Sequence, residues 1–216
     1  MANHLSPGRR ISGRLVARTD LNNLIMQDPH DSLTTERLAL RRFTMDDLEL
    51  LVRLHTDLRV MRHAGGLMSR EQSLEVLRDR IVEYYDTRPG LGVWATHERS
   101  TGACVGLHLL NNIRGEAHIQ VGYLLYPEYW ARGYATEMAV RVLRYGFEAL
   151  GLPQIVAVTD LENRGSQHVL HKAGLLRRGE RGFAHPAYQP GPLAWFERDA
   201  ADWLALHPPA TSPLTP

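Results

Sequence analysis

One short segment of the chain has residue types suited to binding an anion through its main chain. Residues 131–137 read Ala-Arg-Gly-Tyr-Ala-Thr-Glu and stand between a strand pattern and a long helical pattern. The first amides of a helix have no carbonyl partner within it, and the helix dipole adds partial positive charge there. Gly133 and Ala135 lack bulk, so an anion could approach closely, and Arg132 adds a cation. We interpret this turn as a pyrophosphate site, although a tight strand-to-helix turn without a ligand has the same pattern.

A second helix start follows later in the chain. Residues 160–166 read Asp-Leu-Glu-Asn-Arg-Gly-Ser and come directly after a short β-branched run. By itself, Asn163 is an ordinary helix N-cap. Two such helix starts in this order favour a ligand site at the first of them.

The elements that must position these segments follow from hydrophobic periodicity. Residues 35–43 alternate as in a strand, and Thr44 and Ser69 are suited to N-cap two helices, the second ended by Arg88-Pro89-Gly90. The pattern further predicts strands at 92–96, 103–110, 118–126, 155–159 and 193–196, helices at 131–150, 164–173 and 199–206, and loop-like segments at 55–70 and 181–194. Two helices, a meander and then helix–strand–helix–strand indicate one mixed α/β domain.

Composition limits the classes of partner. The 216-residue chain has a formal net charge of +1, so no whole-molecule field draws it to nucleic acid or a membrane, and no specific nucleic-acid partner is expected. No apolar run approaches the ~20 residues that cross a bilayer. Cys104 is the only cysteine, which rules out a disulfide within the chain and favours a reducing, cytoplasmic location.

Some other features are given structural interpretations. His168 and His171 have a spacing that can bind a metal, but no third ligand is apparent, and we expect no metal site. Cys104 is interpreted as a small apolar filler, and three tryptophans are expected in the core: Trp94, Trp195 and Trp203.

The motifs taken together resemble a known family. Residues 126–137, Tyr-Pro-Glu-x-Trp-Ala-Arg-Gly-Tyr-Ala-Thr-Glu, are followed by Asn163-x-x-Ser166 and Lys172-x-Gly174-Leu175. This series closely resembles the GNAT N-acetyltransferases and, within them, the branch that acetylates ribosomal-protein alanine and serine termini. The opening run at residues 35–41 is similar to the first strand of that branch. Trp130 stands where the general motif has Gln or Arg, as is usual in this branch.

The resemblance implies a fold and domain limits. It predicts a central, mostly antiparallel sheet of six to seven strands, with a splay between the fourth and fifth strands and helices on both faces. It covers residues 33–206, preceded by an Arg-rich N-terminal extension at 1–32, expected to be flexible, and followed by a Pro-rich tail at 207–216. Homodimers are common in the branch, so a homodimer is possible.

The resemblance also implies a direct transfer of acetyl from acetyl-CoA, the cosubstrate, to an amine in a ternary complex. Amides of residues 132–136 would hold the pyrophosphate, and the pantetheine arm would pair with the backbone of Leu124 and Tyr126. An amide near Leu124 or Leu125 would stabilise the oxyanion. Asn163 would orient the arm, and Ser166 would protonate the departing thiolate. The implied cofactor-binding residues are Leu124, Leu125, Tyr126, Arg132, Gly133, Tyr134, Ala135, Thr136, Asn163 and Ser166.

Two positions depart from the family pattern. Leu170 stands where many members have a tyrosine acid, which favours Ser166 as the acid. Gln120 stands where members often have a glutamate base. Gln cannot take a proton, so the remaining candidate bases are Glu116, His118 and Glu180, acting through water. An α-amine, with a reference pKa of about 7.7–8.0, would arrive partly neutral and need no strong base.

Several alternatives stay open at this stage. The acceptor could be a protein N-terminus, a polyamine, an amino acid or another small amine. The acyl group could be longer or acidic, such as succinyl. A different class of protein, a non-catalytic acyl-CoA-binding module, would share the cofactor motifs but give no turnover.

Overall fold

The computed structural model describes residues 33–185 and 191–207. The predicted extension at 1–32 and nearly all of the Pro-rich tail lie outside the described residues. The first half of the domain runs through β1 (Leu38–Arg42), a 3₁₀ turn (Met45–Asp47), α2 (Leu48–His55), α3 (Leu58–Met61), α4 (Arg70–Glu75), a π-helical stretch (Val76–Val82), α5 (Glu83–Thr87), β2 (Gly92–Glu98), β3 (Cys104–Asn112) and β4 (Ile119–Leu125).

The second half begins at the predicted cofactor turn. Its elements are a 3₁₀ turn (Pro127–Tyr129), α6 (Tyr134–Arg144) with a π-helical continuation (Tyr145–Ala149), β5 (Gln154–Thr159), α7 (Arg164–Lys172), β6 (Leu176–Gly182), β7 (Pro192–Asp199) and α8 (Ala200–Leu206). The element types and their order follow the sequence prediction, with two exceptions. The short helix α3 lies within residues 55–70, which were predicted to be loop-like. β6 was not predicted, because its sequence Leu-Arg-Arg-Gly-Glu-Arg-Gly has almost no apolar residues and lies largely exposed at the sheet edge.

One seven-stranded sheet, in the order β1-β2-β3-β4-β5-β7-β6, forms the centre of the molecule. Every neighbouring pair is antiparallel except β4 and β5, which are parallel and share a single register pair, Gln120 with Val156. Beyond that pair the two strands diverge. The mostly antiparallel sheet and its splay between the fourth and fifth strands are therefore confirmed.

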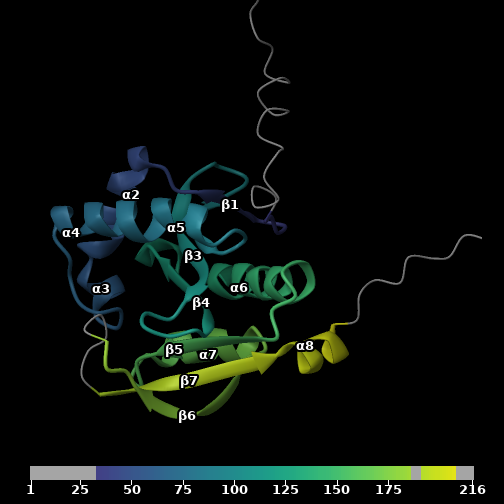
Figure 1. Ribbon diagram of the computed structural model, residues 1–216. Coiled ribbons are helices and arrows are strands. Elements are labelled where there is room, and N and C mark those ends of the chain that lie inside the picture. The colour runs from purple at the N-terminus through teal and green to yellow at the C-terminus, as the bar shows by residue number, and fades with distance from the viewer. Residues whose placement is uncertain (1–32, 186–190, 208–216) are drawn as a thin grey trace, which may run out of the picture.

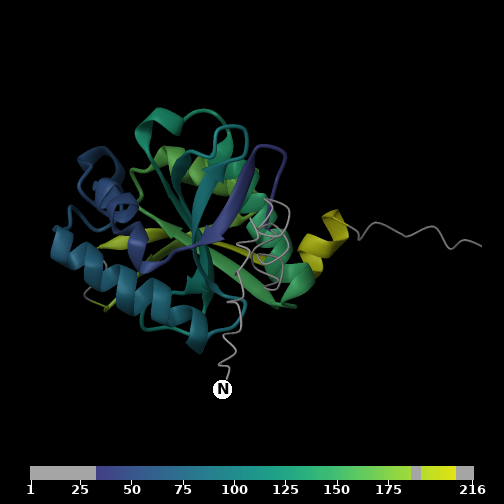
Figure 2. The same cartoon turned by 90° about the horizontal axis from the view of Figure 1, so that it is seen from above.

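Helices cover both faces of the sheet (Figures 1 and 2). On one face, the apolar side of the α4–α5 helix packs with α2 against side chains such as Val93 and Leu107. On the other face, α6, α7 and α8 enclose a larger core that includes Trp94 and Trp203. Val93 and Trp94 point to opposite faces, as strand alternation requires. Trp195 packs in a small third cluster, so all three tryptophans lie in cores as predicted.

The α4–α5 helix begins as its sequence indicates. Ser69 is the N-cap, with its Oγ accepting from the Gln72 amide at 3.2 Å while the Gln72 side chain accepts from the Ser69 amide at 2.8 Å. The apolar spacing of Leu74, Leu77 and Ile81 predicts a buried face that includes Leu74, but Leu74 is 37% exposed. Ser73 is buried instead, because its hydroxyl makes a 3.0 Å hydrogen bond to Nδ1 of the buried His55.

A glycine on β3 lets β4 approach closely at the strand end that leads to the cofactor turn. Gly106 has φ +142° and lies at a register irregularity between β2 and β3. A Cβ there would lie against the Leu124 carbonyl and 2.6 Å from the Leu125 Cα. The close approach therefore requires glycine.

We predict that Gly106→Ala lowers the free energy of unfolding by about 2–3 kcal/mol, because it adds a backbone clash to an unfavourable φ. Urea unfolding followed by circular dichroism measures this loss. Gly102→Ala is the matched control, because Gly102 has φ +75° but nothing within 4 Å of an added Cβ. It should cost only about 1 kcal/mol. Equal losses in the two variants would contradict the role of the clash.

Candidate active site

The turn before α6 presents open amides. Gly133 is the N-cap in the left-handed conformation (φ +80°), and Ala131 has φ +59°. The first intrahelical bond joins the Glu137 amide to the Gly133 carbonyl at 3.0 Å. Among the described residues, no acceptor is found for the amides of Gly133 to Thr136. Residues 131–133 are exposed, so the open amides are accessible from solvent, and anion binding at this turn stays a prediction.

A segment from the start of the domain fixes this turn in place. The Arg37 guanidinium donates to the Arg132 carbonyl at 3.0 Å and to the Glu137 carboxylate at 2.7 Å. It also lies over the Tyr134 ring, 4.7 Å from the centroid. The Thr35 hydroxyl donates to the same carboxylate at 2.5 Å. Sequence reasoning identified residues 35–41 only as a similar strand and missed this clamp, because the contacts join segments about a hundred residues apart.

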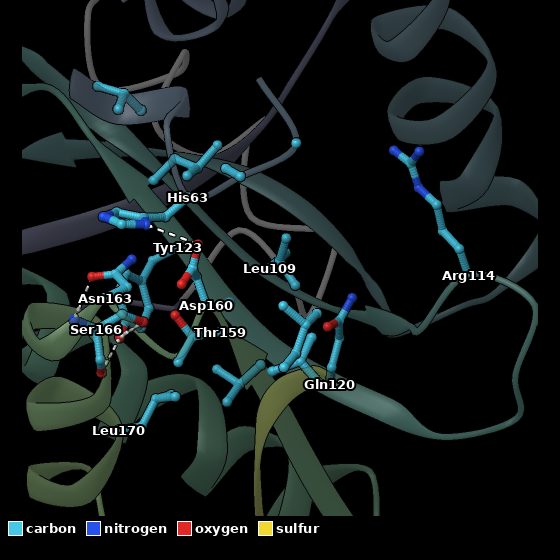
Figure 3. Close-up of a pocket in the computed structure, with 18 of the residues that line it drawn as sticks. His63, Leu109, Arg114, Gln120, Tyr123, Thr159, Asp160, Asn163, Ser166 and Leu170 are labelled. Atoms are coloured by element: carbon cyan, nitrogen blue, oxygen red, sulfur yellow. Dashed lines mark hydrogen bonds and ion pairs between the residues drawn. The ribbon is translucent and has the colours of Figure 1, made fainter. Parts of the chain in front are cut away.

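A cavity of about 330 Å³ lies where β4 and β5 diverge (Figure 3). Its walls come from β4, from the end of β5, from α7 and from the segment that follows α3. Among its lining residues are Gln120, Tyr123, Leu124, Asn163, Ser166 and Leu170. The structure thus brings Leu124, Asn163 and Ser166 of the predicted site together around one space.

Asn163 and Ser166 occupy the first turn of α7. Asn163 is the N-cap, and its Oδ1 accepts from the Ser166 amide at 3.0 Å. Its Nδ2 remains available as a donor. The Tyr123 hydroxyl lies 3.1 Å from both Oγ and the carbonyl of Ser166. Burial raises the pKa of Tyr123, so its hydroxyl stays protonated. Tyr123 was missed from the sequence, because nothing local marks a strand tyrosine as the partner of a serine 43 residues away.

Backbone groups at the end of β4 point alternately toward β3 and toward the splay between β4 and β5. The Tyr126 amide donates to the Val105 carbonyl at 3.0 Å and its carbonyl accepts from Tyr129 at 3.0 Å. Its backbone is fully bonded within the protein, which corrects the expectation that it pairs with the cofactor arm. The Leu124 carbonyl faces Gly106 of β3. Since these groups alternate along an antiparallel strand, the amides of Tyr123 and Leu125 face the splay.

Trp130 has a definite position beside this strand end. Its indole Nε1 donates to the Leu125 carbonyl at 2.8 Å. The carbonyl therefore has a partner where the β4–β5 ladder has already ended. The contact gives a physical reason for a tryptophan in this turn.

The predicted bases Glu116 and His118 lie together near the start of β4. The Glu116 carboxylate is bonded to His118 Nδ1 at 2.8 Å and to Arg181 of β6 at 2.9 Å. His118 packs edge-on against Trp195. Neither residue lines the cavity that holds Asn163 and Ser166, and Glu180 pairs with Arg177 at 3.1 Å. A role for them as bases stays a prediction.

Comparison with known proteins identifies the family. Residues 37–176 match the model of the acetyltransferase (GNAT) domain. The uncharacterized N-acetyltransferase YoaA of Bacillus subtilis is 33% identical over 153 residues, which cover 68% of this chain and 84% of YoaA. The chain belongs to the GNAT acetyltransferase family. It is therefore an acyl-CoA-dependent acetyltransferase.

Solved GNAT structures share the fold. Spermidine N-acetyltransferase from Vibrio cholerae, in complex with CoA and spermine, superposes with a TM-score of 0.62 at 19% identity, covering 79% of this chain and 99% of that one. Ribosomal-protein-S5-alanine acetyltransferase from Vibrio fischeri gives a TM-score of 0.62 at 16% identity, covering 79% and 97%. These likenesses confirm the GNAT fold predicted from the motifs.

This GNAT domain has no ionisable side chain at two positions where the family pattern often has one, and its cysteine is buried in a way that disfavours ionisation. Gln120 lines the cavity and donates to Asn111 Oδ1 at 3.3 Å, and Leu170 is buried in the wall. Burial raises the pKa of the Cys104 thiol, which disfavours a thiolate nucleophile. Among the described residues, no group of three metal-ligating side chains occurs, and no helix is long and apolar enough to cross a membrane.

A second cavity of about 780 Å³ adjoins the first. It lies between the α2–α5 face and the β3–β4 strands, and the two cavities share wall residues that include Leu109, Asn111 and Leu124. Its charged lining residues are Asp79, Arg80, Arg88, Arg114 and Glu116. None of residues 131–137 of the α6 turn lines this second cavity.

Beneath the α6 turn lies a fully buried histidine. His108 of β3 bonds Thr96 Oγ1 at 2.8 Å through Nδ1, and its Nε2 lies 3.4 Å from the Ala135 carbonyl in the first turn of α6. Burial lowers the pKa of His108 to about 3, and burial together with Arg114 lowers the pKa of His55 to about 4. Both histidines are neutral in the folded protein.

We predict that the domain loses stability as the pH falls from 6 to 5. The folded pKa of each histidine lies below its ordinary value of 6.5, so only the unfolded chain gains these protons. Each histidine should contribute about 1.4 kcal/mol per pH unit to the loss. Between pH 6 and 5, His108→Gln should lose about half as much unfolding free energy through these histidines as the wild type does. Urea unfolding at each pH measures this loss. The exposed His168→Gln is the control, and an unchanged slope in His108→Gln would refute the assignment.

Proposed function

We propose that the chain transfers acetyl from acetyl-CoA directly to an amine, with the α6 turn holding the pyrophosphate and the β4–β5 cavity holding the reacting thioester. The open turn and the cavity with Asn163, Ser166 and Tyr123 fit that substrate, and this fit carries the proposal. Small residues expose the turn's amides, and Arg132 adds an exposed cation at its edge. Acetyl-CoA supplies a thioester carbon that an amine can attack.

The chain's own groups then have definite tasks. The Leu125 amide faces the splay and is placed to donate to the oxygen on which negative charge develops. Asn163 Nδ2 is placed to hold amide groups of the cofactor arm. Ser166 Oγ donates a proton towards the departing sulfur, and the Tyr123 hydroxyl, which stays protonated, lies 3.1 Å from Ser166 Oγ and can return a proton to it. This pair replaces the tyrosine acid that the family pattern has at Leu170.

We predict that Arg132→Glu weakens acetyl-CoA binding about 10- to 100-fold, because charge-assisted hydrogen bonds contribute about 1.5–3 kcal/mol each. Isothermal titration calorimetry measures the dissociation constant. Arg144→Glu is the matched control, since Arg144 lies exposed near the other end of α6. It should bind within about twofold of wild type. Equal weakening in the two variants would mean that general charge, rather than the turn, determines affinity.

The second cavity fits an acceptor that carries an acidic group. Its carboxylates already have cationic partners: Asp79 pairs with Arg78 at 2.5 Å, and Glu116 pairs with Arg181. Arg80 and Arg88 have no carboxylate within ion-pair distance among the described residues. The net positive charge of this cavity would repel a polyamine. The carboxylate of an acidic α-amine substrate could instead pair with Arg80 or Arg88. We infer an acidic peptide N-terminus or an amino-acid-like amine as the acceptor class.

We predict that thiol release from acetyl-CoA is at least about tenfold faster with an acidic peptide than with a lysine-containing peptide of the same N-terminus, and slowest with spermine. Charges of one sign in a cleft raise the local concentration of the opposite sign by about this factor or more. The Arg80→Glu, Arg88→Glu double variant should reverse the preference. A faster rate with spermine would contradict the acceptor class, and no thiol release with any amine would leave only the non-catalytic binding module.

A further inference from the structure

A histidine–aspartate pair lies in the β4–β5 cavity. His63 follows α3, and Asp160 follows β5, 97 residues later. His63 Nδ1 lies 3.1 Å from Asp160 Oδ2, and the His63 side chain is only 17% exposed. Both residues line the same cavity as Asn163 and Ser166, and Figure 3 shows the four side chains grouped on one side of it. The pair thus shares the space proposed for the thioester.

The surroundings of Asp160 fix which histidine nitrogen can accept a proton. Asp160 Oδ1 accepts from the Glu162 amide at 2.7 Å, which orients the carboxylate. This hydrogen bond, together with that from His63, lowers the pKa of Asp160, so the group is ionised and can only accept. A neutral imidazole must then donate from Nδ1, which leaves the lone pair on Nε2. Among the described residues, nothing donates to that Nε2.

Other groups in the cavity are poor proton acceptors. Gln120 cannot take a proton and is bonded to Asn111. Burial raises the pKa of Tyr123, so it stays protonated. The other charged groups in the lining are Arg62, beside Asp160, and Arg114, from the β3–β4 turn. Both are cations, so neither can accept a proton.

We propose that His63 is the general base of the acetyl transfer and that Asp160 is its positioning residue. This inference rests on the proposed function. The acceptor ammonium gives one proton to His63 Nε2 and becomes a neutral amine. Its nitrogen forms a bond to the acetyl carbon, the carbon–sulfur bond breaks, and the electron pair leaves on sulfur. The second amine proton passes to solvent as the amide forms. Ser166 Oγ protonates the sulfur and takes a proton back from solvent, and His63 returns its proton to solvent, so that one proton is released per transfer.

The kinetic test uses the full chain, acetyl-CoA and the acceptor with the fastest thiol release. His63→Gln should lower kcat at pH 7 about 10²- to 10⁴-fold without changing the acetyl-CoA dissociation constant. Raising the pH until the acceptor is itself deprotonated should restore kcat to within about tenfold of wild type, because the base is then not needed. Asp160→Asn should lower kcat with little change in KM. His168→Gln, on the exposed side of α7, is the matched control and should match wild type at every pH.

A second measurement does not depend on turnover. Nitrogen-15 NMR of histidine-labelled protein should show His63 as the Nδ1–H tautomer at neutral pH, and Asp160→Asn should remove that preference. The Nε2–H tautomer in wild type would overturn the inference. So would a wild-type pH profile in His63→Gln, in which case the acetyltransferase proposal would stand. Absence of thiol release by the wild type itself would overturn both proposals.

Discussion

The divergence of β4 and β5 beyond one register pair is the constraint on which the site depends. Parallel neighbours in a sheet ordinarily satisfy each other's amides and carbonyls, and a buried backbone group without a partner is costly. Here Gln120 and Val156 end the pairing, and the following groups need other partners. Trp130 supplies one by donating to the Leu125 carbonyl. The remaining edge lines a cavity, so the same geometry that interrupts the sheet creates the place where a ligand can complete it.

Two helix starts lie at the two sides of this opening, and each is held by contacts from elsewhere in the chain. The α6 turn is clamped by Arg37, and the α7 turn is closed by the Asn163 cap and by Tyr123 from β4. In the proposed mechanism, anion binding and proton donation therefore belong to different helices that pack on one sheet. The close approach of β3 to β4 at Gly106 supports the same strand end from the other side.

Much of the fold could be predicted from the sequence, because most elements have a clear period and recognisable ends. The α6 turn, Asn163 and Ser166 were also recognisable, since small residues and caps at helix starts are local signals. The partners of these residues were not. Arg37 to Glu137, Tyr123 to Ser166 and His63 to Asp160 join segments that only the sheet topology brings together. The strand β6 was not predicted for a different reason, because an exposed edge strand needs no alternation of apolar and polar residues.

Ala131 shows what this arrangement implies for affinity. A non-glycine residue at φ +59° is in a conformation that costs about 1–2 kcal/mol, and it persists because neighbouring contacts hold the chain on both sides. The free energy of folding offsets that conformational cost before any ligand binds. The loop is consequently rigid before any ligand arrives, and little conformational entropy remains to be lost on association.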